Sequence, residues 1–185
     1  MKRSLFAAAL SGIVLASLPG EASAQVSSVA KPVQIGVALG AALPTSDLSD
    51  VVNTGYNGTV TVGFNPAMIP LGIRVDGAYN QFAIKDAIGN GNVHFASVTG
   101  NLVYQIPGAT VSPYAIGGAG WYRAAVNITG FGSGSENHFG WNLGGGIKLP
   151  LSGFDTFIEA RYNQVQMSNG DPTLKFVPIT FGIMF

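Results

Sequence analysis

Hydrophobic and polar residues alternate along most of the chain, which is the side-chain period of a β-strand with two different faces. In the segment 71–82, Leu71 and Ile73 fall on one face, whereas Arg74 and Asp76 fall on the other. The pattern predicts eight strands, at residues 33–42, 56–64, 71–82, 93–106, 112–123, 138–149, 155–166 and 175–185. In the fifth of these segments, frequent glycine leaves the two faces unassigned.

The lengths and connections of these segments are typical of a membrane barrel. Most run to about 9–12 residues, and a tilted strand crosses the hydrocarbon core in about 9–11. Short connections that contain proline, as tight turns do, alternate with longer polar ones. The short connections are 65–70, 107–111 and 150–153, and the long ones are 44–55, 83–92, 125–137 and 168–174. In an outer-membrane barrel the short turns and both termini face the periplasm.

Closure of the sheet follows from the cost of an edge in lipid. Each unpaired backbone group in hydrocarbon costs several kcal/mol, so we expect the first strand to pair with the last. The predicted fold is all-β, an eight-stranded antiparallel up-and-down transmembrane β-barrel over residues 25–185. Aromatic residues near strand ends are expected to form interfacial girdles. They are Tyr56, Phe64, Tyr79, Tyr104, Tyr114, Trp141, Tyr162 and Phe185.

Residues 1–24 have the features of a signal peptide. Two basic residues follow the first Met, an apolar run occupies 5–18, and residues 22–24 read Ala-Ser-Ala. A transmembrane anchor is the alternative, but the apolar run is shorter than the roughly 20 residues that a spanning helix needs. We therefore expect cleavage before Gln25 and export from the cytoplasm.

The composition supports a membrane protein and excludes several other classes. Of the 185 residues, 47% are hydrophobic and only 10% are charged, and 26 are glycine. Soluble domains usually carry about 25% charged residues, so this chain lacks an ordinary water-facing surface. The absence of cysteine excludes disulfide scaffolds, thiol catalysis and cysteine-based zinc sites. A net charge of zero gives no electrostatic footprint for nucleic acid.

Two motifs carry a resemblance to a known family. The segment 175–185 alternates apolar residues and ends in Phe185, and the Pro-Tyr pair at 113–114 is followed by spaced glycines. The chain thereby resembles the small eight-stranded outer-membrane barrels of the OmpA-domain and OmpX type. The resemblance implies a place in the cell outer membrane, contact with outer-membrane lipid, and assembly by periplasmic chaperones and the barrel-assembly machinery. It also implies that Phe181, Ile183 and Phe185 belong to an assembly signal.

The two histidines, His94 and His138, give no sign of a metal or catalytic site. They lack ligand spacing and an accompanying acidic cluster, so exposed interfacial positions are expected. Lipid A deacylases share the barrel architecture and resemble a His-x-Ser arrangement with a carboxylate. In this chain the first hydroxyl after His94 is Ser97, three residues away and on the opposite strand face. We therefore expect no enzyme and no catalytic, cofactor-binding or metal-binding residue.

Four charged residues fall on the inner faces of two predicted strands. Arg74 and Asp76 lie on one strand, and Glu159 and Arg161 lie on another, at similar heights above the short turns. In a barrel of eight strands, side chains fill the narrow bore, and an unpaired charge there is costly. The pattern predicts a structural salt-bridge network between the four. A gated ion path is the alternative.

Three functions are compatible with this barrel. We favour a structural or surface-interaction role through extracellular loops at 44–55, 83–92 and 125–137, with an unidentified extracellular partner. A small passive pore is the alternative, and an outer-leaflet lipid-modifying enzyme is a third possibility. A secreted binding protein with an apolar interior does not fit, because the continuous aliphatic face would then be exposed to water.

Overall fold

The computed structural model describes residues 32–185 except 67–68, 88, 107–110, 129–131 and 168–172. Its elements are β1 (Val33–Thr45), α1 (Asp47–Val51), β2 (Gly55–Phe64), β3 (Leu71–Ala83), β4 (Gly91–Gln105), β5 (Ser112–Ile128), β6 (Gly132–Pro150), β7 (Asp155–Val165) and β8 (Leu174–Met184). Among the described residues, no helix is long and apolar enough to cross a bilayer. The predicted signal segment 1–24 lies outside the described residues.

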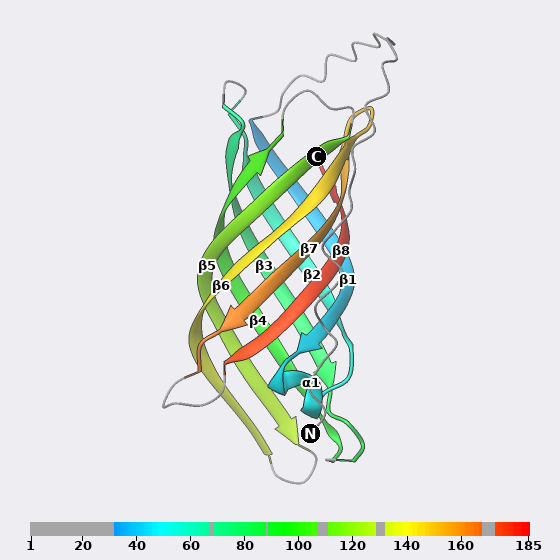
Figure 1. Ribbon diagram of the computed structural model, residues 1–185, viewed down its shortest axis with the longest axis vertical. Coiled ribbons are helices and arrows are strands. Elements are labelled where there is room, and N and C mark those ends of the chain that lie inside the picture. Colours follow the sequence, from blue (N-terminus) through cyan, green and yellow to red (C-terminus); the bar gives the residue numbers. More distant parts are fainter. Residues whose placement is uncertain (1–31, 67–68, 88, 107–110, 129–131, 168–172) are drawn as a thin grey trace, which may run out of the picture.

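The eight strands form a closed antiparallel barrel in which each strand pairs with the next along the chain (Figure 1). The predicted closure is confirmed, because β1 pairs with β8 from Gly36 opposite Met184 to Thr45 opposite Lys175. The first and last strands are thus joined by a hydrogen-bonded seam, as a hydrocarbon surrounding requires. The predicted fold class is therefore confirmed.

The two ends of the barrel differ. At one end, which we call the α1 end, the short helix α1 lies beside the mouth, at the bottom of Figure 1. At the other end, which we call the C-terminal end, β8 finishes and β1 begins, at the top of Figure 1. The connections β2–β3, β4–β5 and β6–β7 also lie at the C-terminal end.

The wall is apolar outside and largely polar inside. Leu39 and Trp121 are 74% and 71% exposed, whereas Arg74 and Asp76 are 5% and 1% exposed. This inversion of the usual soluble pattern is typical of a barrel that faces lipid. In β5, whose faces the sequence left unassigned, Tyr122 turns inward beside the outward Trp121.

The connection expected at 125–137 is mostly strand, so that prediction is wrong. β5 and β6 pair as far as Ile128 opposite Gly132. β4 supports the same extension, because its Gly91 pairs with Ile128. Glycine and serine in this segment suggest a loop, but backbone pairing with two neighbours sets strand length here more than side-chain type does. In another long connection, 44–55, the structure contains the helix α1, which was not predicted.

Candidate functional site

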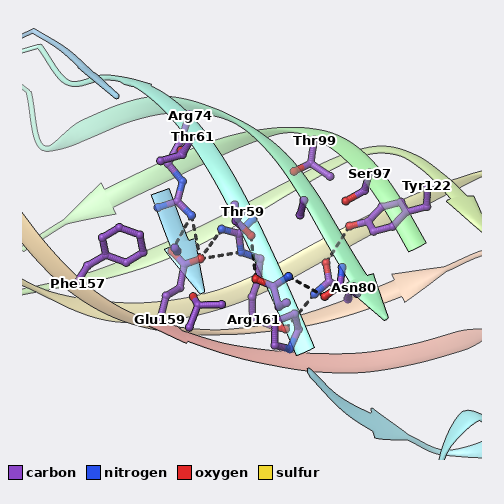
Figure 2. Close-up of a pocket in the computed structure, with 16 residues that line it drawn as sticks. Thr59, Thr61, Arg74, Asn80, Ser97, Thr99, Tyr122, Phe157, Glu159 and Arg161 are labelled. Atoms are coloured by element: carbon purple, nitrogen blue, oxygen red, sulfur yellow. Dashed lines mark hydrogen bonds and ion pairs between the residues drawn. The ribbon is translucent and has the colours of Figure 1, made fainter. Parts of the chain in front are cut away.

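The four charged residues predicted for the lumen meet inside the barrel. Figure 2 shows three of them, Arg74, Glu159 and Arg161. The Arg74 Nη2 atom donates to both carboxylate oxygens of Glu159, at 2.9 and 2.7 Å. The Arg74 Nε atom lies 3.0 Å from Asp76 Oδ1, and Arg161 Nη1 donates to Asp76 Oδ2 at 2.8 Å. Arg161 also pairs with Glu159. Each guanidinium therefore contacts both carboxylates, and we call this group the charged ring.

The charged ring joins β3 and β7, which lie on opposite sides of the barrel. All four residues are buried, and their two positive and two negative charges balance. A buried charge is tolerated when it is paired and its remaining hydrogen-bonding atoms are satisfied. The closed set of ion pairs supplies such pairing, and it fixes two facing walls of the bore at one height.

Neutral hydrogen-bonding groups extend the charged ring. The Tyr114 hydroxyl donates to Glu159 Oε2 at 2.8 Å, and Asn101 Nδ2 donates to Asp76 Oδ2 at 2.9 Å. Asn142 Nδ2 in turn donates to Asn101 Oδ1 at 2.9 Å. The ring is thus tied to β4, β5 and β6 as well as to β3 and β7.

Tyr114 was predicted in an interfacial girdle, and that prediction is wrong. The side chain is 7% exposed and points into the bore. A Cβ atom on Gly146, its partner across the β5–β6 ladder, would lie 2.6 Å from the Tyr114 hydroxyl oxygen. Only glycine at 146 leaves this space. Sequence reasoning missed the residue because the register that pairs it with Gly146 is not visible in either strand alone.

The α1 end of the bore is closed by an apolar cluster that the sequence analysis did not predict. Phe82, Phe95 and Phe176 are fully buried, with ring centroids 5.2–6.0 Å apart. Leu48 and Val52, from α1 and the residue after it, join the same cluster. We call these five residues the aromatic plug. The inner face is therefore polar at the charged ring and apolar toward the α1 end.

Further side chains close the C-terminal end. Ile116, Phe157 and Met184 are buried together on that side of the charged ring. Beyond them, Asp155 accepts a hydrogen bond from Gln34 at 2.8 Å and lies 3.5 Å from the Lys148 ammonium. The bore is thus filled by apolar, charged, apolar and polar layers in turn.

Two small spaces lie inside the barrel near the charged ring. A cavity of about 30 Å³ lies beside Arg74, Glu159 and Arg161, and another of about 20 Å³ lies beside Tyr114 and Lys148. A buried water needs roughly 10–15 Å³ of such volume, so each space is large enough for only a few waters.

The two histidines occupy different surroundings. His94 faces outward and stacks on Tyr79, with ring centroids 5.7 Å apart. His138 was expected to be exposed, and that prediction is wrong, because it is 4% exposed and points inward. Its Nε2 atom lies 3.7 Å from the Glu136 carboxylate. Within the described ranges, no group of three or more histidine and acidic side chains could hold a metal ion.

The three residues expected to form an assembly signal lie on the outer face of β8 and at its end. Phe181 and Phe185 are 54% and 56% exposed, and Ile183 lies between them on the same face. The Phe185 amide donates to the Ile35 carbonyl at 2.8 Å, and the Ile35 amide donates back at 3.2 Å. The Phe185 backbone thus forms part of the seam that closes the barrel, while its side chain remains accessible.

Comparison with known proteins gives a family and a set of similar folds. The sequence matches the family described as outer membrane protein beta-barrel domain over residues 8–185. No curated protein matches it significantly.

Several solved structures share the barrel. Neisserial surface protein A (NspA) aligns with a TM-score of 0.68 at 16% identity, over 83% of this chain and 96% of that chain. The attachment invasion locus protein Ail of Yersinia pestis aligns with a TM-score of 0.52 at 19% identity, over 82% and 98%. The outer membrane enzyme PagL aligns with a TM-score of 0.51 at 17% identity, over 82% and 98%. At these identities the likeness establishes the fold.

Proposed function

Because this chain belongs to the family of outer membrane protein beta-barrel domains, we propose that it acts as a closed barrel that presents its α1 end to partners outside the cell. The protein lies in the outer membrane. Its α1 end faces outward in this proposal, since short turns of such barrels face the periplasm. Periplasmic chaperones and the barrel-assembly machinery deliver the chain in the same proposal.

The observation that carries the proposal is the filled bore. An ion that crosses the barrel must displace the aromatic plug and then pass the charged ring, whose ion pairs already satisfy one another. Moving an ion through an apolar layer is costly because nothing there replaces its water. The filled interior therefore favours a structural or surface-interaction role over a passive pore.

The α1 end offers a surface suited to contact with other molecules. β6 pairs with β7 only from Gly140 onward, whereas its pairing with β5 starts at Gly132. The end of the β5–β6 hairpin therefore extends beyond β7 at the α1 end. Ser135, Glu136 and Asn137 on this hairpin are exposed. Loops held by a rigid scaffold commonly carry binding functions. The name of Ail describes an attachment protein on a similar barrel, which adds support for a contact role here.

The lipid-modifying alternative has little geometric support. PagL is an enzyme on a similar barrel, so the architecture permits such chemistry. In this chain His94 faces outward, whereas Ser97 is 9% exposed and faces the bore. Among the described residues, no carboxylate lies within ion-pair distance of His94. A hydrolytic site of hydroxyl, imidazole and carboxylate is therefore not assembled around it.

Conductance of the purified barrel tests the closed-bore part of the proposal. Wild-type protein refolded in detergent and inserted into planar bilayers is expected to give no stable open-channel current. Gel mobility with and without heating, together with circular dichroism, verifies that the inserted protein is folded. Long-lived open currents from folded protein would replace the proposal with a pore function.

Labelling on intact cells tests the orientation. The chain has no cysteine, so each introduced thiol is unique. Glu136, which is exposed at the α1 end, and Ser152, which is exposed in the β6–β7 connection, are each replaced by cysteine. A maleimide that cannot cross membranes should label Glu136→Cys and spare Ser152→Cys until the cells are lysed. The reverse pattern would overturn the orientation.

A further inference from the structure

The outer wall of the barrel has a hollow toward the α1 end. Its volume is about 540 Å³, and β2, β3, β4, β5 and β6 all contribute to it. Gly58, Gly77 and Ala96 provide little side chain across its floor, whereas Tyr79 and Trp121 are large residues at its borders. We call this hollow the wall groove.

Strand register explains the shape of the wall groove. Ala96 pairs with Tyr79 on one side and with Arg123 on the other. Gly77 pairs with Val98 in the neighbouring row. A Cβ atom added at Gly77 would meet nothing within 4 Å, so this part of the floor is open toward the outside. The groove is therefore a place where the wall lacks side chains between bulky neighbours.

The chemistry of the wall groove changes along its length. Trp121 and Val98 are 71% and 60% exposed and supply apolar surface. Nearer the α1 end, Arg123 is exposed and donates to the Ser135 hydroxyl at 3.0 Å. Among the described residues, Arg123 forms no ion pair. One end of the groove thus carries a positive charge without a carboxylate partner, and the other end is apolar.

Polar groups flank the charged end. The Tyr79 hydroxyl donates to Gln81 Oε1 at 3.1 Å, and Asn137 pairs with Arg123 across the β5–β6 ladder. Amide and hydroxyl groups of this kind suit a ligand that carries hydroxyls as well as negative charge. The arrangement matches a lipid whose chain lies along the wall and whose polar part sits at the membrane surface.

We propose that the wall groove binds one phosphorylated glycolipid of the outer leaflet, with an acyl chain over Gly77 and a phosphate at Arg123. The groove opens on the surface that faces lipid, so a membrane lipid reaches it without leaving the bilayer. A guanidinium forms short, charge-assisted hydrogen bonds to phosphate. The inference rests on the proposed orientation, which sets Arg123 at the outer leaflet.

The matched variants are Gly77→Leu, Arg123→Gln and Gly100→Leu. Gly77→Leu places an apolar side chain in the groove, and a Cβ atom at Gly77 meets nothing within 4 Å. Gly100 lies in the outward row of β4, as Gly77 does in β3. A Cβ atom added at Gly100 likewise meets nothing within 4 Å, and Gly100 does not line the groove. Gly100→Leu therefore adds the same side chain to the same lipid-facing wall at a place where no ligand is expected.

Each protein is inserted into nanodiscs of phosphatidylcholine that contain a minor fraction of lipid A, and native mass spectrometry counts the lipid A that each barrel retains. Wild type and Gly100→Leu are expected to retain one molecule. Gly77→Leu and Arg123→Gln are each expected to lower the retained fraction about tenfold, since one charge-assisted contact or one seated chain contributes on this scale. Wild type should retain dephosphorylated lipid A only weakly. The retained fraction should be similar to that of intact lipid A on Arg123→Gln.

Two outcomes of the retention experiment overturn the wall-groove proposal. Equal retention of lipid A by all four proteins would mean that the groove binds none. A dimer that Gly77→Leu abolishes, without preferential lipid A retention, would assign the groove to a second copy of the chain. If cell labelling reverses the orientation, the proposed function fails, whereas correct labelling with equal retention rejects the groove alone.

A second measurement follows the groove directly. The chain has two tryptophans, so Trp141→Phe leaves Trp121 as the only one. Brominated acyl chains on a phosphorylated glycolipid are expected to quench Trp121 fluorescence more than equally brominated phosphatidylcholine does. Gly77→Leu should remove this preference, and Gly100→Leu should keep it. An equal response to both lipids in the wild-type background would overturn the proposal.

Discussion

The charged ring and the aromatic plug occupy neighbouring stretches of one bore and fill it by different means. Arg74 and Glu159 hold opposite walls together through ion pairs, whereas Phe95 and Phe176 fill the space by stacking, with ring centroids 5.2 Å apart. A buried ion pair depends on each partner, because the loss of one leaves the other charge uncompensated. An apolar cluster loses the contacts of the side chain removed and gains a cavity in its place, but no charge is left unpaired.

This difference predicts how each region responds to substitution. The charged ring should be sensitive to the loss of any one member and tolerant of concerted replacement by apolar residues of similar volume. The aromatic plug should respond in proportion to the volume removed. Both regions should keep the bore closed when the other is altered, since each blocks it independently.

The largest effect is expected for Glu159→Ala. The change leaves Arg74 and Arg161 facing each other with one carboxylate between them, and it removes the acceptor of the Tyr114 hydroxyl. We expect a loss of about 3–5 kcal/mol in the free energy of unfolding. Urea titration of the refolded barrel, followed by tryptophan fluorescence, measures it. A loss below about 1 kcal/mol would show that the ring is solvated or redundant.

A smaller effect is expected for Phe95→Ala in the aromatic plug. Removing the ring leaves a cavity beside Phe82 and Phe176. We expect the free energy of unfolding to fall by about 3 kcal/mol. This is the low end for such changes, because Leu48 in the same cluster can settle toward the gap. Phe139→Ala is the matched control, since that phenylalanine is 50% exposed on the outer wall. The same urea titration should show little change for the control. Equal losses of unfolding free energy for Phe95→Ala and Phe139→Ala would mean that packing in the aromatic plug stabilises the barrel no more than an exposed side chain on the outer wall does.

The comparison also predicts conductance for the same two variants. Neither Glu159→Ala nor Phe95→Ala should open a stable channel in planar bilayers, because one blocking region remains in each. The double variant should conduct more than either single variant. Open currents from Phe95→Ala alone would show that the charged ring does not block ions by itself.

A weaker ion pair at the C-terminal end provides a lower reference point. Asp155 lies 3.5 Å from the Lys148 ammonium and keeps a hydrogen bond from Gln34. Asp155→Asn is expected to cost about 1 kcal/mol or less in urea titration, because this pair is partly solvated. A loss of unfolding free energy as large as that of Glu159→Ala would mean that ion pairs near the end of the bore stabilise the barrel as much as those in the charged ring.

A small effect on the folded barrel is expected on deleting Phe185, which belongs to neither region, because the deletion removes one exposed side chain and the two backbone hydrogen bonds to Ile35 at the end of the seam. Its side chain is 56% exposed, and its ring lies 6.1 Å from that of Phe154. The proposed assembly signal predicts normal refolding in detergent and failed insertion in cells. Gel mobility measures refolding of the purified variant in detergent, and cell fractionation measures its insertion into the outer membrane of cells. Normal insertion of the deletion variant in cells would rule out a targeting role for this residue.

Much of the barrel could be predicted from side-chain alternation, because the period of two determines which residues share a face. Arg74 and Asp76 were assigned inward in this way, as were Glu159 and Arg161. The same parity carries Phe82 and Phe176 into the bore, so the signal for the aromatic plug was present. It was missed because an inner face was expected to be polar throughout, whereas its polarity changes with depth.

The rest of the site depends on register between strands. Tyr114 reaches Glu159 only because Gly146 lies opposite it across β5 and β6, and Asn101 reaches Asp76 from the neighbouring β4. Pairing of this kind joins residues far apart in the chain. The hydrophobic pattern of one strand does not show which residue of the neighbouring strand lies opposite each of its own. The β5–β6 extension was missed for the same reason.

The seam between β1 and β8 has a consequence for the way the protein is made. Ile35 and Phe185 exchange amide hydrogen bonds across it, so the barrel closes through contacts of very high sequence separation. Such contacts carry the largest loop-closure entropy and form slowly. Until β8 arrives, every intermediate exposes two unpaired edges that can join other chains. A polypeptide interrupted before β8 is therefore an aggregation hazard and not a smaller barrel, which makes biogenesis all-or-none.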